Sequence, residues 1–500
     1  MANDTARSPL KGARPPAGLP QYVYQPPYYH AVPPPGPIVY TQYPRYRSSP
    51  LRRFLIALLV AVGIWALASV AMHAAVHHRH RHWGHRWNIP PGVVVDRCVG
   101  GSAWALAENA TPVLQPSSPP APMPQPSSRP VPVPQPLSNP NLAEAEFELP
   151  LDSASIVLLA RQGSSWFPHW MSTSMSGKLE IATSPDLQYV ARVIFSSPHG
   201  RLDYAGVSAC LISRGEGETG VGIFTPNSWT GFGSASYNVR LIFPESSNSS
   251  SSLRLKGLVT DLPNFSHDVG NLKDIEFKTV SFKTSNSHVH VQSLFADHAT
   301  LSTSNGAISA NSLVARDITL RTSNAGISGS FNVTGSLDLH TSNAPIAVRV
   351  GLESRGRASP ARLTMRTSNN RLQSDISLAS PQRRGGSFGV TATTSNGRLD
   401  MRFLESPRDA ALDVTARTSN SPAALALHSA YEGAFAADTS NAPASVRRLH
   451  AGEEEKEGRV MEVEQVRRQS VRGVAYWEKG HMDYGMVRLR ASNSPVVLSI

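Results

Sequence analysis

Cysteine and ionisable residues are scarce in this sequence. Its 500 residues include two cysteines, and Asp, Glu, Lys and Arg together account for 17%. The pair Cys98 and Cys210 allows at most one disulfide, which excludes a disulfide scaffold and a cysteine-rich zinc site. An ordinary soluble enzyme of this length carries more ionisable surface, so one compact catalytic domain is not expected.

The basic residues also lack the arrangement that nucleic-acid binding requires. The sequence has 47 Lys and Arg against 36 Asp and Glu, which gives a formal net charge of +11. Most of this excess is arginine in loop-like segments, without the interleaved aromatic residues of a nucleic-acid interface. Nucleic acid is therefore not an expected partner.

Proline, by contrast, is abundant in one part of the chain. Residues 1–150 hold 27 of the 40 prolines, a composition that packs poorly into a core. We predict a disordered Pro/Tyr-rich tail at 1–53, and a His-rich juxtamembrane segment with a Pro-rich linker at 77–146. Within the tail, Pro26, Pro27 and Tyr29 form a PPxY motif, which makes a cytosolic WW-domain protein a candidate partner.

Residues 54–76 form an apolar run without a formal charge. The run is long enough to cross a hydrocarbon core of about 30 Å, so it predicts one transmembrane helix. Four arginines in the 20 residues before it, against three in the 20 after it, favour a cytoplasmic N-terminus. We therefore expect a single-pass protein of the cell surface or secretory pathway. The lipid bilayer is a partner in this interpretation, and the residues after 76 are extracytoplasmic.

A histidine cluster follows the predicted span. Imidazoles at this density can bind transition metals or respond to pH. The favoured alternative is a basic, aromatic anchor at the membrane interface, because no ordered scaffold fixes a ligand geometry. No cofactor is assigned, and the candidate metal ligands are His77, His78, His80, His82 and His85.

A short triplet recurs in the C-terminal part of the chain. Thr-Ser-Asn or Ala-Ser-Asn begins at residues 284, 303, 322, 341, 367, 394, 418, 439 and 491. The final interval of 52 residues is interpreted as two periods of 26, with a degenerate copy near Gln465. Residues four and two before each triplet, and five after it, are apolar in every copy. This alternation predicts strands on both sides, and the change of parity at the triplet predicts a corner.

One strand, a corner and a second strand in 19 residues describe one coil of a β-solenoid. We predict an all-β fold, with a β-rich capping region at 147–279 and a solenoid of about ten coils at 280–500. By parity the triplet asparagines point inward, and they would stack at the strand spacing of about 4.8 Å as a structural ladder that frays at Asn493. The ladder residues are Asn286, Asn305, Asn324, Asn343, Asn369, Asn396, Asn420, Asn441 and Asn493.

Three of the longer repeats carry insertions about ten residues after the asparagine, at 353–362, 380–387 and 405–410. Insertions at one corner of stacked coils emerge on one face, so they would gather arginines into a basic ridge. The alternative is a set of solvated loops, and the acidic segment 453–457 has the opposite sign. The candidate polyanion-binding residues are Arg355, Arg357, Arg383 and Arg384, with Arg362 and Arg408 beside them.

Three further segments accompany the repeats: FELPL at 147–151, RGEGETGVGIF at 214–224 and DLPNFSHDVG at 261–270. With them, the chain resembles single-pass fungal membrane proteins that carry a domain of unknown function. The extracytoplasmic part of that family looks like the β-solenoid domain of bacterial adhesin-type proteins. The resemblance covers about residues 147–500, and it implies a fold and a surface location but no catalytic residues.

Three functional hypotheses follow. The first is a structural or adhesin-like binding role without catalysis, with a cell-wall polysaccharide or another surface protein as partner. The second is a carbohydrate-active β-helix enzyme, although the β region has no GxSxG, HExxH or P-loop motif. The third is a metal or pH sensor that uses the histidine cluster. Against the second, the aspartates of the repeats share no single repeat position: Asp317, Asp338, Asp375, Asp400 and Asp413.

Overall fold

The computed structural model describes residues 89–100, 105–106, 143–151, 155–161, 175–197, 207–215, 217–225, 235–245, 252–356, 358–449 and 458–500. The predicted tail, the apolar run 54–76, the PPxY motif and the histidine cluster lie outside these residues. Within the described residues, no helix combines the length and the apolar content that a membrane crossing needs.

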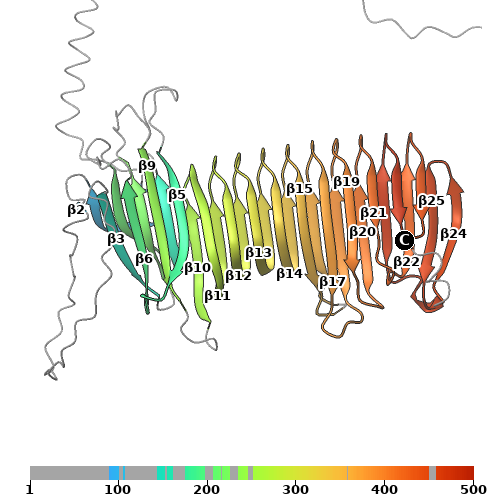
Figure 1. The fold of residues 1–500 in the computed structure, drawn as a ribbon, viewed down its shortest axis with the longest axis horizontal. Helices are drawn as coiled ribbons and strands as arrows, with labels where there is room; N and C mark the ends of the chain where they lie inside the picture. The colour runs from blue at the N-terminus through green and yellow to red at the C-terminus, as the bar shows by residue number, and fades with distance from the viewer. Residues whose placement is uncertain are drawn as a thin grey trace, which may run out of the picture. The chain divides into compact units, whose positions relative to one another are not determined.

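Each repeat forms one coil, and the coils stack side by side (Figure 1). The segment after a triplet lies on one side of the stack, here called face A, and the segment before the next triplet lies on the other, called face B. Four strands run over both faces: β11 (Phe265–Lys283), β12 (Val289–Ser302), β13 (Ile308–Arg321) and β14 (Ile327–His340).

From residue 346 onward the two faces have separate strands, because the insertions interrupt the coil. Face A contains β15 (Ile346–Glu353), β17 (Leu372–Ala379), β19 (Leu399–Glu405), β21 (Ala423–Ala426), β23 (Ala444–Arg447) and β27 (Val496–Ser499). Face B contains β16 (Ala361–Arg366), β18 (Ser387–Thr393), β20 (Ala411–Arg417), β22 (Gly433–Thr439) and β26 (Met486–Ala491).

Neighbouring coils pair in parallel, with equal repeat positions opposite each other: Val289 faces Ile308, and Leu301 faces Leu320. The apolar residues two and four positions before the triplet are buried in all nine copies. Those five positions after it are buried too, except the partly buried Ala444. The predicted alternation is confirmed, and the inward side chains of both faces form one continuous core.

Seven of the eight triplet threonines are buried at the corner, as the alternation predicts, and Thr439 is partly buried. A buried hydroxyl needs a hydrogen-bond partner. The seven buried threonines find it in the preceding coil, whereas Thr439 donates to the Ala442 carbonyl oxygen in its own turn. Thr322 Oγ1 donates to the Gly306 carbonyl oxygen at 3.1 Å, and Thr418 Oγ1 donates to that of Gly397 at 3.1 Å. Equivalent bonds join Thr341 to Ala325 and Thr367 to Ala344. These seven threonines therefore tie their corners to the preceding coil from inside.

The triplet asparagines lie outside the corner, so the prediction that they point inward is wrong. All nine are exposed, and the residues around them are bends rather than strand. Strand alternation ends at the threonine, and two residues later the chain is turning, which carries the asparagine to the outer surface.

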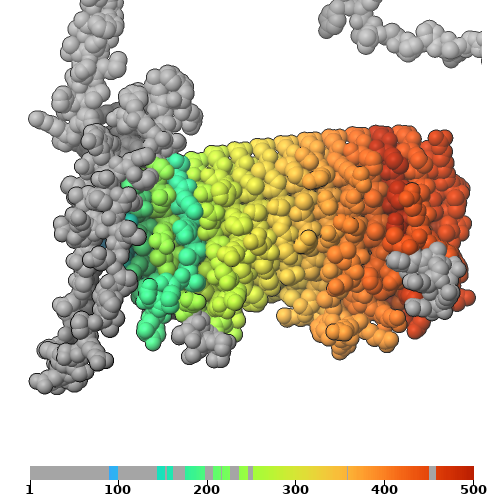
Figure 2. All heavy atoms as spheres, viewed as in Figure 1, coloured from blue at the N-terminus to red at the C-terminus, as the bar shows by residue number. Residues whose placement is uncertain are grey.

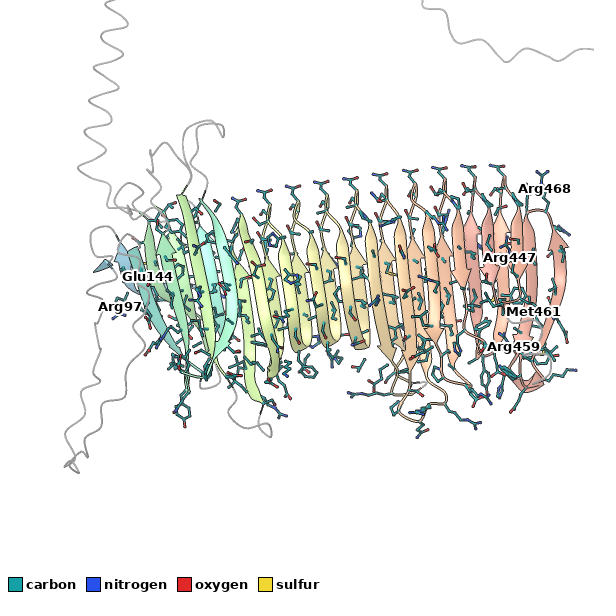
Figure 3. All side chains as sticks on the ribbon, in the orientation of Figure 1. Arg97, Glu144, Arg447, Arg459, Met461 and Arg468 are labelled. Carbon is teal, nitrogen blue, oxygen red and sulfur yellow. A yellow bond between two sulfur atoms is a disulfide. The ribbon has the colours of Figure 1, made fainter. Side chains whose placement is uncertain are left out.

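On that outer surface the asparagine amides form an unbroken chain of hydrogen bonds. Each Nδ2 donates to the Oδ1 of the preceding asparagine, over distances of 2.5–2.9 Å. Figure 3 shows a regular row of side chains along this edge, at the top of the view. The spatial order is Asn264, Asn286, Asn305, Asn324, Asn343, Asn369, Asn396, Asn420, Asn493 and Asn441.

At the N-terminal end the stack continues beyond residue 280 and then closes with antiparallel strands. On face A, β5 and β9 continue the parallel order, and β6, β3 and β2 follow in antiparallel pairing. On face B, β10, β4 and β8 are parallel, and β7 and β1 are antiparallel. The predicted boundary at residue 280 is therefore not where parallel pairing begins.

The bounds of these strands also correct the predicted linker 77–146, which contains β1 and β2 and the start of β3. The ten strands are β1 (Val93–Gly100), β2 (Ala105–Leu106), β3 (Ala143–Pro150), β4 (Ser155–Arg161), β5 (Met175–Ser184), β6 (Val190–Ser197), β7 (Ser208–Arg214), β8 (Glu218–Phe224), β9 (Ala235–Pro244) and β10 (Leu253–Asp261).

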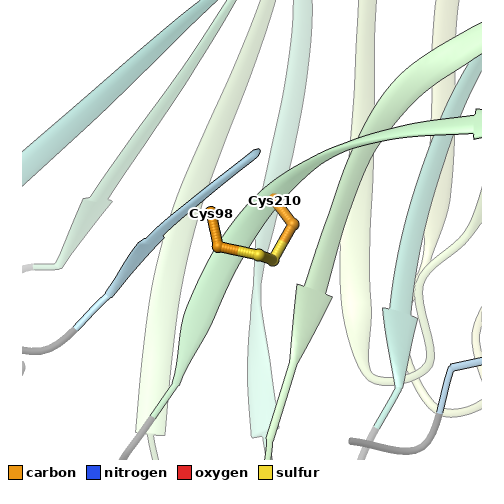
Figure 4. Close-up of a disulfide and its surroundings, with 2 residues drawn as sticks. All are labelled: Cys98 and Cys210. Carbon is orange, nitrogen blue, oxygen red and sulfur yellow. A yellow bond between two sulfur atoms is a disulfide. The ribbon is translucent and has the colours of Figure 1, made fainter. Parts of the chain in front are cut away.

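The two cysteines form a disulfide between β1 and β7 (Figure 4). Cys98 lies directly opposite Cys210 in the antiparallel register. Around it, Val157, Leu159 and Phe224 form a small second core on the side of β4 and β8 that faces away from the main core. The bridge therefore fastens the outermost strand of face B, whose other edge has no strand partner among the described residues.

At the C-terminal end the chain order and the spatial order differ. Strand β26 pairs with β20 on one side and with β22 on the other, and β27 lies between β21 and β23. The last coil is thus inserted between two coils that precede it in the sequence. Figure 1 accordingly marks the C-terminus short of the end of the stack, where β24 lies.

The interval of 52 residues is therefore not two periods with a degenerate copy near Gln465. Its residues form β24 (Val460–Arg467) and β25 (Ser470–Tyr476), an antiparallel hairpin, followed by the short 3-10 helix η3 (Lys479–His481). Strand β25 pairs antiparallel with β22, so the hairpin covers the end of face B. Arg468, labelled in Figure 3, lies in the turn of this hairpin.

Candidate binding surfaces

The three insertions come together at the corner opposite the asparagine ladder. They project from the lower edge of the stack near β17 in Figure 1, and they protrude below the orange coils in Figure 2. Ser354 Oγ accepts the Ser387 N–H at 3.0 Å, and the Gly385 N–H donates to the Arg408 carbonyl oxygen at 2.7 Å. Each insertion is therefore hydrogen-bonded to the next, and together they are called the insertion corner.

The arginines of the insertion corner do not form a uniform cationic ridge. Arg355, Arg383, Arg384 and Arg408 are exposed there, and Arg357 lies outside the described residues. Arg384 Nε lies 3.8 Å from a carboxylate oxygen of Asp409, and the Arg408 guanidinium lies 5.6 Å from the centre of the Trp477 ring. Asp409 therefore offsets part of the positive charge of the insertion corner, and the Trp477 ring contacts another of its guanidinium groups.

A second cationic surface lies on face B. The residue immediately before each triplet points outward, and the parallel register places these residues in one row, here called the Arg row. Neighbours in the row are separated by the strand spacing of about 4.8 Å. In spatial order the Arg row is Lys283, Ser302, Arg321, His340, Arg366, Thr393, Arg417, Arg490 and Asp438.

The row two positions earlier in each coil carries mostly small hydroxyl side chains and is called the Thr row. It comprises Ser281, Thr300, Thr319, Asp338, Thr364, Thr391, Thr415 and Arg488. Between the two rows lies an open depression of about 510 Å³ that is lined by Arg321, His340, Arg362, Arg366, Thr364, Ser336, Leu337 and Asp338. Arg362, expected in the basic ridge, therefore lines the face and not the insertion corner.

Three cations of the Arg row lie near carboxylates, and Lys283 at its first position lies 3.7 Å from an oxygen of Asp261. Arg321 lies 3.6 Å from a carboxylate oxygen of Asp338, and Arg490 lies 3.6 Å from one of Asp438. In the described part of the chain, Arg366 and Arg417 in the middle of the row have no ion-pair partner. Their exposed guanidinium groups remain able to bind anionic groups of a ligand.

The Arg row could have been found in the sequence. Five of the nine residues that precede a triplet are Lys or Arg, and a sixth is His340. The alignment of the repeat on its apolar positions draws attention to the core and the insertions, while these basic residues occupy the outward positions between the apolar ones.

The aspartates considered for a carbohydrate-active enzyme are distributed over both faces. Asp317, Asp338 and Asp413 lie on face B, and Asp375 and Asp400 lie on face A. Four of them contact an arginine: Asp317 with Arg316, Asp338 with Arg321, Asp375 with Arg402 and Asp400 with Arg398, at 2.9–3.6 Å. Carboxylates held in separate ion pairs do not form the facing pair that glycoside hydrolysis uses.

Comparison with known proteins gives weak likenesses. No protein-family model matches the chain, and no curated protein matches it. A "putative adhesin" from Parabacteroides merdae matches at 8% identity and a TM-score of 0.21, over 57% of this chain and 92% of that protein. A "putative cell adhesion protein" from Clostridium sporogenes matches at 9% identity and a TM-score of 0.13, over 72% and 99%.

A third structure, a "putative adhesin" from Parabacteroides distasonis, matches at 10% identity and a TM-score of 0.20, over 54% of this chain and 97% of that protein. TM-scores this low do not show a common fold, so fold and function here depend on the residues described above.

Proposed function

We propose that residues 89–500 form a non-catalytic, adhesin-like binding scaffold that holds an elongated anionic polymer along the Arg row. The observation that carries this proposal is the pair Arg366 and Arg417, which lie in one row of the parallel sheet and have no acidic partner among the described residues. A carboxylated or phosphorylated polysaccharide repeats its charge along a line, as the row does.

The shape of face B supports an extended ligand. The side chains of the Thr row are short, so a polymer can lie flat beside the guanidinium groups and form hydrogen bonds with the hydroxyls. Such a surface gives many weak contacts spread over several coils, which suits a repetitive ligand better than a compact one.

The proposal includes the cellular setting that the sequence suggests. The apolar run 54–76 supports attachment to a membrane, and the arginine count around it supports an extracytoplasmic scaffold with a cytoplasmic N-terminus. In that setting the ligand is a cell-wall polysaccharide or an acidic glycan on another surface protein.

A binding assay with full-length protein tests the function. Polygalacturonate is the anionic probe and a neutral β-glucan is the control polymer, and both are titrated at about 0.05 M and about 0.5 M NaCl. We expect binding of the anionic polymer only, with an affinity that falls as salt rises. Equal binding of both polymers, or an affinity indifferent to salt, would reject the proposal.

A further inference from the structure

Three segments that are distant in the sequence meet where the inserted coil enters the stack. Asp409 lies in the insertion between β19 and β20, Glu432 lies in the loop between β21 and β22, and His481 ends η3 just before β26. One donor atom from each side chain lies within 4.8 Å of the other two. This cluster borders the insertion corner through Asp409 and is separate from the Arg row.

The donor atoms are arranged around the imidazole. His481 Nδ1 lies 3.1 Å from Glu432 Oε2 and 3.6 Å from Asp409 Oδ1. The Glu432 side chain is 3% exposed, that of His481 16% and that of Asp409 32%. The cluster therefore combines a buried carboxylate at Glu432 with a partly exposed one at Asp409.

The buried carboxylate is held in a fixed orientation by the backbone. Glu432 Oε1 accepts the N–H groups of Trp477 at 2.9 Å and Glu478 at 3.2 Å. Both oxygens of this carboxylate also face His481, whose Nδ1 lies 3.2 Å from Oε1 and 3.1 Å from Oε2. Because Oε1 already accepts two backbone N–H groups, Oε2 is the oxygen better able to coordinate an ion.

The imidazole is held equally well. The Tyr484 ring stacks on it at 4.1 Å between ring centres, with 18° between the planes. Glu478 Oε2 lies 3.6 Å from Nε2, the ring nitrogen that faces away from the other two carboxylates. At 3.6 Å this is an ion-pair contact and not a hydrogen bond, so the stacked Tyr484 ring is the contact that holds the imidazole on this side.

The spacing of the donors fits a single ion. Tetrahedral ligands at about 2.0–2.1 Å from a metal lie about 3.3 Å from each other, and the two distances to Nδ1 fall on either side of that value. One imidazole with two carboxylates suits a divalent first-row transition metal, while calcium and magnesium prefer sites built from oxygen alone. Asp409 contacts Arg384 through Oδ2, so Oδ1 is available to the ion.

We propose that Asp409, Glu432 and His481 bind a divalent transition metal such as Zn²⁺, with water in the fourth position. The ion joins the insertion corner, the start of β22 and the start of β26, and so fixes the inserted C-terminal coil in place. The two carboxylates balance its charge. This site is independent of polymer binding on face B.

Metal titration of the full-length chain tests the site. Because the histidines at 77, 78, 80, 82 and 85 can also bind metal, the parent protein for this test has those five residues changed to Ser. After treatment with EDTA, ZnCl₂ is titrated by calorimetry, and CoCl₂ is added in a separate sample whose visible absorption reports tetrahedral coordination. We expect one equivalent of tightly bound metal, a visible cobalt band and a higher melting temperature.

Two variants of the proposed ligands complete the test, and they differ in how much each change could disturb folding. His481→Gln and Asp409→Asn should each lower the metal affinity at least tenfold and remove the cobalt band. Asp409 is half-exposed, so its variant should fold even if a change at His481 does not. The control is His298→Gln, which removes a histidine that lies 3.2 Å from Asp317 and belongs to no second metal-ligand cluster among the described residues. No bound equivalent in the parent, or equal affinity in Asp409→Asn, would overturn the proposal.

Discussion

His267 is a buried histidine of β11 whose surroundings predict a pH-dependent stability. Its Nδ1 lies 3.1 Å from the Phe265 carbonyl oxygen and its Nε2 lies 2.7 Å from Thr260 Oγ1, so the neutral ring donates to the carbonyl and accepts from the hydroxyl. Burial lowers the pKa of His267 to about 4, although the Phe265 carbonyl favours the protonated ring. The folded state therefore holds the histidine neutral.

This pKa predicts a loss of stability in mild acid. Above its unfolded pKa of about 6.5 the ring is neutral in both states, and as the pH falls towards 4 only the unfolded state takes up the proton. The free energy of unfolding should fall over that window by an amount on the order of 3 kcal/mol. Urea unfolding at several pH values measures it. His267→Gln should flatten the dependence, whereas the exposed His340→Gln should leave it unchanged.

The asparagine ladder gives a second prediction at the scale of single residues. Asn324 has a ladder neighbour on each side, whereas Asn441, the last in spatial order, has one among the described residues. At about 0.5–1.5 kcal/mol per hydrogen bond, Asn324→Ala should cost about twice as much stability as Asn441→Ala.

The effect of changing Asn493 shows whether the free energy of unfolding follows the order of the coils in the sequence or their order in the stack. It lies between Asn420 and Asn441, so Asn493→Ala should match Asn324→Ala in its free energy of unfolding. If Asn493→Ala were instead as mild as Asn441→Ala, the inserted position of the last coil would be contradicted.

Among the elements, those defined by the repeat were predictable and those without it were not. The apolar positions around each triplet predicted the strands and the buried threonines, because alternation reports directly on burial. The asparagines were placed on the wrong side because alternation was extended through a bend. The antiparallel strands β1 and β2 were missed because they follow and precede proline-rich sequence and contain no triplet.

The candidate binding residues likewise include some that the sequence predicts and others that it does not. The insertion corner was predictable, since insertions at one repeat position must emerge together, yet the ion pair of Arg384 with Asp409 depends on loop conformation. The cluster of Asp409, Glu432 and His481 could not be found from spacing, because it depends on the order in which the last coils stack.

At the scale of the whole stack, the inserted coil makes the C-terminus an internal element. Removing residues 482–500 takes away β26 and β27, which separate β20 and β21 from β22 and β23. We expect the segment 427–481 to detach, since it loses its parallel partners on both faces. Limited proteolysis should then cleave β22 to β25 while β11 to β20 stay protected. Equal protection of β22 to β25 in the truncated and full-length chains would contradict the topology.

The binding role is tested most directly by comparing three double variants of the full-length protein in the polygalacturonate assay. The variants are Arg366→Ser with Arg417→Ser on the Arg row, Arg355→Ser with Arg383→Ser at the insertion corner, and Arg349→Ser with Arg371→Ser among exposed arginines elsewhere. Each removes two charges, so net charge is matched. The Arg row variant should lose affinity about tenfold or more, and the other two should bind nearly as the parent does. Full affinity in the Arg row variant, or an equal loss in all three, would contradict the account.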